Sequence, residues 1–191
     1  MNYELICVGA SWGGVTAVGR MLDDLSDEID QPIVVVQHRG VSRADGGLAD
    51  VLQHHTRRVV RDAHDKDPIE RNRVYLAPAD YHLLVERGWL SLSTDERVNF
   101  ARPSLDVLFD SAADAYGPAV IGVVLTGAND DGAAGLARIK ERGGVAVIQD
   151  PADSEKRAMP DAAIAATTAD AVLPLEEIPR FLYGLCCKVT A

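Results

Sequence analysis

A stretch near the start of the chain decides the fold: Tyr3-Glu4-Leu5-Ile6-Cys7-Val8-Gly9-Ala10-Ser11-Trp12-Gly13-Gly14, followed directly by Val15-Thr16-Ala17-Val18. Apolar strand formers give way to small residues and then to a helical pattern, which predicts a buried strand, a tight turn and a helix. Residues 9–13 have the spacing G-x-S-x-G, typical of a sharp elbow that exposes a serine hydroxyl beside a helix N-terminus. Ser11 is therefore a candidate nucleophile. The pattern also fits a glycine-rich turn that binds a phosphate or only packs strand against helix.

Length and composition limit the function classes. The 191 residues suit one domain spanning 1–191, and 47% hydrophobic with 25% charged residues is ordinary for a globular protein. A formal net charge of -10 argues against nucleic acid or an anionic membrane surface as the main partner. The three cysteines have neither metal-site nor disulfide spacing. No signal peptide or membrane-spanning run is visible, so we expect a cytoplasmic protein without membrane insertion.

Strand-like and helix-like segments alternate along most of the chain. Strands are expected at 32–38, 57–61, 119–125, 145–149 and 171–173, with those at 32–38 and 119–125 buried, and helices at 15–25, 47–55, 103–116, 133–142, 158–166 and 175–187. Pro103 is expected in the first turn of its helix. This alternation predicts an α/β fold with a doubly wound, mostly parallel sheet of the Rossmann-like type.

The middle of the chain has a different pattern. Three short apolar runs occur at 73–77, 81–85 and 89–93, and the last two are joined by Glu86-Arg87-Gly88, a connection suited to a β-hairpin. We therefore expect an antiparallel β-hairpin insertion in this region.

Three polar residues follow the carboxyl ends of predicted buried strands: Ser11, His38 and an aspartate, either Asp131 or its neighbour Asp130. Open parallel sheets collect their sites at these ends. A serine needs a base near neutral pH, imidazole has a reference pKa of about 6.5, and a carboxylate fixes the tautomer of the imidazole. The sequence predicts a Ser-His-Asp triad. Individually, His38 also fits a polar strand end, and either aspartate fits a helix N-terminus.

Several motifs occur in a characteristic order along the chain. They are residues 8–14, Val35-Val36-Gln37-His38, residues 74–78 followed by 81–84, Arg102-Pro103-Ser104-Leu105-Asp106-Val107-Leu108-Phe109, residues 125–135, Met159-Pro160 and Leu173-Pro174-Leu175. With these motifs the chain, from about residue 3 to 182, resembles the catalytic domain of the chemotaxis receptor methylesterase (CheB) family. The resemblance implies hydrolysis of glutamate methyl esters on the cytoplasmic helices of chemoreceptors, with possible glutamine deamidation, and neither a metal nor a cofactor.

The resemblance also implies roles for single residues. Ser11 is then the nucleophile, His38 the base and Asp131 the acid, which decides against Asp130. The oxyanion donors map to the backbone N–H groups of Trp12 and Ala128. Substrate contacts are expected from Arg39, Arg102 and Met159, and Arg43 is a further basic candidate near the cleft.

The chain departs from the family pattern around the expected cleft. The changes are Trp12 for the usual Thr, Arg39-Gly40 for Met-Pro, Ala128-Asn129-Asp130 for a Met-x-Gly-like turn and residues 154–157 for a more apolar stretch. Family members commonly carry a receiver domain, and none is recognisable here, so a receiver domain or other signalling proteins are expected only as partners. The alternative function is a family member with weak or no turnover that binds a partner in a signalling complex.

Overall fold

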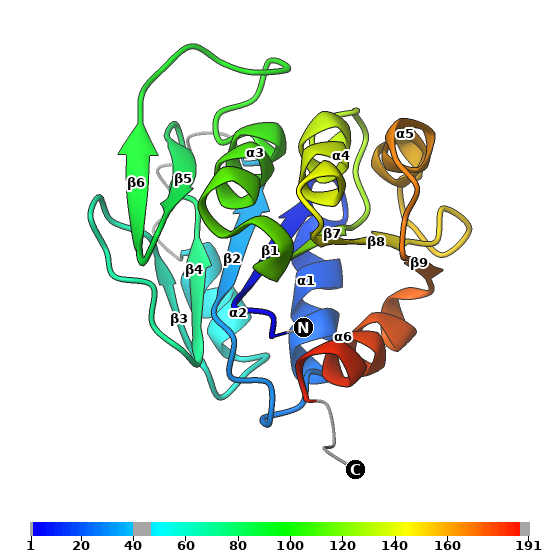
Figure 1. Ribbon diagram of the computed structural model, residues 1–191, viewed down its shortest axis with the longest axis horizontal. Coiled ribbons are helices and arrows are strands. Elements are labelled where there is room, and N and C mark those ends of the chain that lie inside the picture. The colour runs from blue at the N-terminus through cyan, green and yellow to red at the C-terminus, as the bar shows by residue number, and fades with distance from the viewer. Residues whose placement is uncertain (1, 40–46, 188–191) are drawn as a thin grey trace.

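The computed structural model describes residues 2–39 and 47–187, and its centre is a seven-stranded sheet (Figure 1). The strands are β1 (Leu5–Ala10), β2 (Ile33–Gln37), β3 (Val59–Asp62), β4 (Arg73–Leu76), β7 (Val120–Val124), β8 (Val145–Gln149) and β9 (Ala171–Leu173). They are ordered β3-β4-β2-β1-β7-β8-β9, and every neighbouring pair is parallel. The predicted doubly wound parallel sheet is confirmed.

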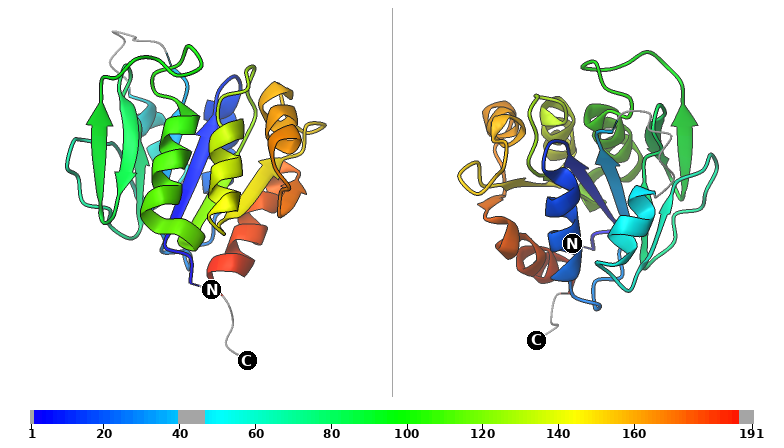
Figure 2. Two further views of the ribbon diagram at one scale, coloured as in Figure 1. Left: turned by 45° about the horizontal axis from the view of Figure 1, so that its top comes forward. Right: turned by 180° about the vertical axis from the view of Figure 1, so that it is seen from behind.

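Helices cover both faces of this sheet. They are α1 (Gly14–Asp23), α2 (Leu48–Gln53), α3 (Leu105–Tyr116), α4 (Ala133–Glu141), α5 (Ala158–Ala166) and α6 (Ile178–Cys186), with 3-10 turns at Gly117–Ala119 and Leu175–Glu177. Helices α3, α4 and α5 lie on one face, and α1, α2 and α6 lie on the other, as the view from behind in Figure 2 shows. No helix in the described part of the chain is long and apolar enough to cross a membrane.

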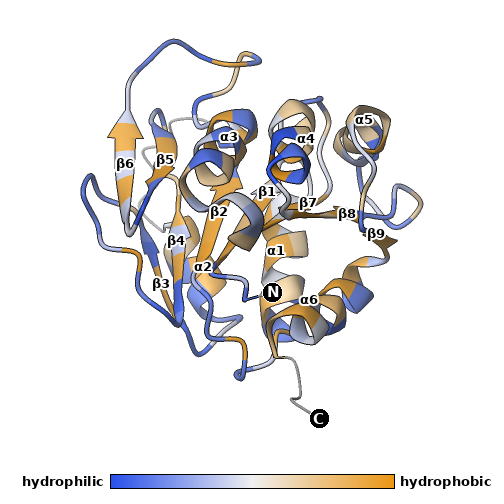
Figure 3. Cartoon of the chain, viewed as in Figure 1, coloured by the Kyte–Doolittle hydropathy of each residue, from blue (hydrophilic) through white to orange (hydrophobic). Residues whose placement is uncertain are grey.

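The two faces have separate hydrophobic cores because successive side chains of a strand point to opposite sides. In β1, Ile6 and Val8 pack on the α1 side, and Leu5 and Cys7 pack on the α3 side. Cys7 is fully buried, and burial raises the pKa of its thiol. In Figure 3 the central strands are mostly hydrophobic, and hydrophilic residues gather in the peripheral loops.

The predicted hairpin forms from β5 (His82–Glu86) and β6 (Trp89–Ser93), which pair antiparallel as a separate sheet packed on α3. The run at 73–77, which shares the hairpin's short apolar pattern, instead supplies β4 of the main sheet. Pro103 is also not in the first helical turn as predicted. Ser104 is the N-cap of α3, and its hydroxyl accepts a hydrogen bond from the Val107 N–H, so the helix begins at Leu105.

The strand order sets the position of a site. Strands β1 and β7 are neighbours at the middle of the sheet. From β1 the chain continues to β2 toward one edge of the sheet, and from β7 it continues to β8 toward the other edge. The strand order therefore reverses between β1 and β7. Ligands of such sheets bind outside the carboxyl ends of the strands at this point. Ser11 follows β1, and residues 125–132 follow β7, so both segments lie there.

Strand β1 and helix α3 pack closely at Gly9. A Cβ added to Gly9 would collide with the side chain of Leu105 and lie 3.2 Å from Phe109. We expect Gly9→Ala to lower the free energy of unfolding by about 1–3 kcal/mol, measured by urea denaturation. Gly184→Ala is the control because no described atom lies within 4 Å of the added Cβ on α6, so a gain of about 0.5–1 kcal/mol is expected. Equal stability of the two variants would contradict the close packing.

Candidate active site

The Ser11 turn is held by hydrogen bonds from three directions. The Ser11 N–H donates to the Thr126 carbonyl at 3.0 Å, and the Ser11 carbonyl accepts from the Gly14 N–H at 2.9 Å. The side chain of Gln37 also donates to the Ser11 carbonyl, at 2.7 Å. Gly13 has a φ of 76°, a conformation that glycine adopts without strain because it has no Cβ, and α1 follows directly. These contacts fix the Ser11 backbone and leave its hydroxyl free for other partners.

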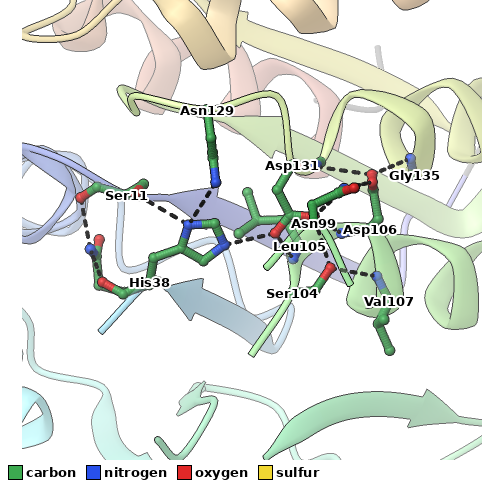
Figure 4. Close-up of polar contacts among 12 residues, drawn as sticks. Ser11, His38, Asn99, Ser104, Leu105, Asp106, Val107, Asn129, Asp131 and Gly135 are labelled. Atoms are coloured by element: carbon green, nitrogen blue, oxygen red, sulfur yellow. Dashed lines mark hydrogen bonds and ion pairs between the residues drawn. The ribbon is translucent and has the colours of Figure 1, made fainter. Parts of the chain in front are cut away.

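His38 lies between Ser11 and Asp131, as Figure 4 shows. Its Nδ1 is 3.2 Å from the Ser11 Oγ, and its Nε2 is 2.7 Å from Oδ2 of Asp131. An ionised carboxylate only accepts hydrogen bonds, so Nε2 of a neutral His38 carries the ring proton. The lone pair of Nδ1 then faces the serine hydroxyl, which is the arrangement that lets an imidazole take a proton from it.

Asp131 is almost fully buried, at 1% exposure, and its carboxylate lies at the N-terminus of α3. It accepts hydrogen bonds from the Ser104 hydroxyl at 2.8 Å and from the backbone N–H groups of Leu105 at 2.7 Å and Asp106 at 3.2 Å. Burial alone would raise the pKa of Asp131, but the hydrogen bonds from His38, Leu105, Ser104 and Asp106 outweigh it and lower the pKa. The site therefore holds Asp131 as an anion.

Asp106 is a half-buried carboxylate of α3, and it accepts hydrogen bonds at the N-terminus of α4. Its Oδ1 accepts from the N–H groups of Gly132 at 3.0 Å and Gly135 at 2.7 Å. Asn99 donates both to Asp106, at 2.8 Å, and to Asp131, at 3.3 Å. Burial and the nearby charge of Asp131 raise the pKa of Asp106 despite these hydrogen bonds. Asp131, in the loop before α4, thus binds the N-terminus of α3, and Asp106 of α3 binds the N-terminus of α4, which fixes the two helices relative to each other.

Because the pKa of Asp131 is lowered, the contribution of Ser104 to the free energy of unfolding is expected to depend on pH. Because the hydroxyl favours the ionised carboxylate, its stabilisation is present above the unfolded-state pKa and is lost as pH falls through the lower folded-state pKa. Ser104→Ala is therefore expected to cost about 1.5–3 kcal/mol of unfolding free energy near neutral pH.

Urea denaturation of parent and Ser104→Ala protein across pH measures this contribution. The difference in unfolding free energy is expected to shrink below about pH 4, the reference pKa of an aspartate in the unfolded chain, and to be lost as the pH falls through the lower folded-state pKa of Asp131. A residual difference remains because the N-cap bond of Ser104 to Val107 does not involve a titrating group. A difference that is constant across pH would show that Ser104 does not act through the charge of Asp131.

The two expected oxyanion donors lie in the loops that flank Ser11. Within the described residues, neither the Trp12 nor the Ala128 N–H donates a hydrogen bond to the protein. The Trp12 carbonyl accepts from the Thr126 hydroxyl at 3.0 Å, which orients this turn. The Trp12 ring is 59% exposed, and its Nε1 donates to Glu155 at 2.8 Å. Both N–H groups are thus available to a ligand.

A cavity of about 500 Å³ opens beside His38. Its lining comes from His38, Arg39, Asp80, Arg97, residues 99–103 and Asn129. The predicted substrate residues Arg39 and Arg102 both belong to it, each bound to an aspartate, Asp62 at 2.7 Å and Asp80 at 2.8 Å respectively. The third, Met159, is buried at 1% exposure and packs against Gly127 beneath the loop that follows β7. Arg43 lies outside the described residues.

Several polar residues of the site were not assigned a role from the sequence. Gln37 joins the carbonyls of Ser11 and His38 through its amide, at 2.7 and 3.0 Å, and Asn129 approaches Nδ1 of His38 at 3.4 Å. Ser104, Asp106 and Asn99 support Asp131, as described above. The motif before α3 was visible in the sequence, but its contact with residue 131 is made only in the fold. Asp130 is exposed, and Asp131 is the aspartate next to His38.

The described residues contain no group of three or more His, Cys, Asp or Glu side chains placed to hold a metal ion.

Comparison with known proteins assigns the family. Residues 6–182 match the family model described as CheB methylesterase. A protein of Leptospira interrogans named "Putative protein-glutamate methylesterase/protein-glutamine glutaminase" is 49% identical over 97% of this chain and 96% of its own length. A "Protein-glutamate methylesterase/protein-glutamine glutaminase 2" of Anaeromyxobacter dehalogenans is 43% identical over 95% of this chain and 53% of its own length.

A solved structure agrees with these matches. The crystal structure of the Thermotoga maritima CheB methylesterase catalytic domain aligns with a TM-score of 0.90 at 31% identity, covering 97% of this chain and all of that one. The matched residues include the strand-end loops that carry Ser11, His38 and Asp131. The chain belongs to the CheB methylesterase family.

Proposed function

We propose that this protein hydrolyses glutamate methyl esters on chemoreceptors, with Ser11, His38 and Asp131 as its catalytic triad. The observation that carries the proposal is the continuous hydrogen-bonded chain from the Ser11 Oγ through the two ring nitrogens of His38 to the buried Asp131 carboxylate. The substrate class follows the names of the relatives, which are protein-glutamate methylesterases and protein-glutamine glutaminases.

The proposed reaction forms and then hydrolyses an acyl-enzyme. Ser11 Oγ attacks the side-chain ester carbonyl as its proton passes to Nδ1 of His38, and Asp131 stabilises the imidazolium that results. The N–H groups of Trp12 and Ala128 stabilise the negative oxygen of the tetrahedral intermediate. Protonated His38 gives its proton to the departing methoxide, releasing methanol. Water then attacks the glutamyl-Ser11 ester and gives its proton to His38. The bond from the acyl carbon to Ser11 Oγ breaks, His38 returns the proton to Ser11 Oγ, and glutamate leaves with a free carboxylate.

Glutamine deamidation is a second candidate activity because the relatives' names include it. The same steps apply to a side-chain amide, with ammonia leaving in place of methanol. His38 protonates the leaving group in both cases, so the geometry needs no additional residue.

The proposal also gives a location and partners. Methylated helices of chemoreceptors lie in the cytoplasm, so we place this protein there, and a receiver domain or other signalling protein is a candidate regulator. The alternative is a family member that binds such a partner without turnover, using the altered cleft around Trp12 and Asn129.

Methanol release from a methyl-esterified receptor fragment tests the proposal. We expect continuous release by the parent protein, and ammonia release from the matching glutamine fragment would add the second activity. A fluorophosphonate, which reacts with activated serines, is expected to block release and to label Ser11 in a peptide map. Well-folded protein that binds the fragment but releases no methanol would support the non-catalytic alternative instead.

A further inference from the structure

The most exposed large hydrophobic side chain of the described structure, Phe100, lies at the tip of a tight turn. Val98 and Ala101 exchange two backbone hydrogen bonds, at 3.2 and 2.8 Å, around the central residues Asn99 and Phe100. Both central residues have positive φ, 49° and 61°, as a type I′ turn requires. Asn is favoured there, but a phenylalanine is disfavoured and its ring is 98% exposed. Neither turn formation nor core packing accounts for an aromatic residue at this position.

The turn is held next to the candidate active site. In Figure 1 the loop between β6 and α3 arches above the hairpin and α3, and residues 99–103 line the same cavity as His38 and Asn129. On one side of the tip, Asn99 donates to Asp131 and Asp106. On the other, Arg102 donates to the carbonyls of residues 94 and 95, at 2.8 and 2.9 Å. These anchors fix the position of Phe100 relative to His38.

Three arginines gather at the cavity that Phe100 also lines. Arg39, Arg97 and Arg102 line it with Asp80, although the formal net charge of the chain is -10, and Arg39 and Arg102 are each paired with an aspartate. Arg97 has a 63% exposed side chain, and its contact with Asp80 is long, at 3.9 Å. Its guanidinium is therefore available to a carboxylate of a bound partner.

We propose that the turn at residues 97–100 docks the protein substrate. Phe100 packs against an apolar side chain of the receptor segment beside the esterified glutamate, and Arg97 pairs with a neighbouring carboxylate of that segment. An aromatic anchor gives contact area at low entropic cost, and a rim charge guides association. This inference rests on the proposed function for the identity of the substrate, but docking is measurable without turnover.

Phe100→Gly separates docking from folding. Asn-Gly is the preferred pair for a type I′ turn, so the variant removes the ring while the turn is retained or strengthened. We expect its urea-unfolding midpoint to be equal to or above that of the parent. In the Ser11→Ala background, the affinity for a glutamate-methylated receptor-helix fragment is expected to fall about 10-fold or more, measured by calorimetry.

Two further measurements complete the test. In the active protein, kcat/KM for the methylated fragment is expected to fall more than kcat/KM for p-nitrophenyl acetate, because the small ester does not reach the turn. Val59→Ala is the control, since Val59 is also exposed but lies at the amino end of edge strand β3. Arg97→Gln is expected to weaken binding roughly threefold at low salt and much less at high salt.

The measurements distinguish failure of the docking proposal from failure of the esterase proposal. An unchanged affinity of Phe100→Gly, or equal losses with the fragment and the small ester, would overturn the docking role even if the parent is an active esterase. A parent that binds the fragment through Phe100 but releases no methanol would overturn the esterase proposal and leave docking established.

Discussion

Ser11→Ala is expected to lower kcat for methyl ester hydrolysis by about 10⁵- to 10⁶-fold, the loss seen when a triad nucleophile is removed. Alanine has no oxygen to attack the ester, and His38 then has no proton to accept from this position. Binding and oxyanion stabilisation remain, so the residual rate is expected to stay above that of the reaction in water. The measurement is methanol release from the methylated receptor fragment at saturating substrate.

The same substitution is expected to leave the fold intact. The contacts that hold the turn use the Ser11 N–H and carbonyl, bound by Thr126, Gly14 and Gln37, and alanine keeps both groups. The urea-unfolding midpoint is therefore expected to stay close to that of the parent. Ser91→Ala, which removes a hydroxyl from β6, is the control and should retain full activity. More than one per cent of parental kcat in Ser11→Ala would point to another nucleophile.

The parts of the fold that depend on local pattern could be predicted from the sequence. Continuous β-branched runs mark strands buried on both faces, and small residues mark the turn at Ser11. The strands therefore appear near their predicted places, and their ends bring Ser11, His38 and Asp131 together. The run at 73–77 shows the limit of this reasoning. A short apolar run fits a hairpin strand or a strand of a parallel sheet equally well, and only the strand order, in which β4 lies between β3 and β2, decides between them.

The support of the site depends on contacts between distant residues, which the sequence pattern does not contain. Ser104 and the N–H of Leu105 lie 27 and 26 residues before Asp131 and reach it only because α3 packs beside the loop after β7. The orientation of the His38 ring, with Nδ1 toward Ser11, likewise follows from where these carboxylate and hydroxyl partners lie. No sequence pattern predicts the position of Phe100, because a single exposed aromatic residue in a loop does not belong to a periodic pattern.

Asp131→Asn is expected to lower kcat by about 10⁴-fold, since an amide in place of the carboxylate does not fix the tautomer of His38 or stabilise its imidazolium. It should also destabilise the protein, because both carboxylate oxygens of Asp131 accept hydrogen bonds. Oδ2 accepts from His38 and the Leu105 N–H, and Oδ1 accepts from the Ser104 hydroxyl and the Asp106 N–H. Either orientation of the amide therefore points its NH₂ group at a backbone donor.

The misplaced NH₂ group determines how much unfolding free energy Asp131→Asn is expected to lose. A buried donor left without an acceptor costs about 1–3 kcal/mol, so the free energy of unfolding of Asp131→Asn should fall by that amount in urea denaturation. Asp130→Asn makes the same chemical change one residue earlier, on an exposed side chain, and is expected to keep both activity and stability. If Asp130→Asn instead lost activity while Asp131→Asn kept it, the acid of the triad would be Asp130, and the buried carboxylate would only join α3 to α4.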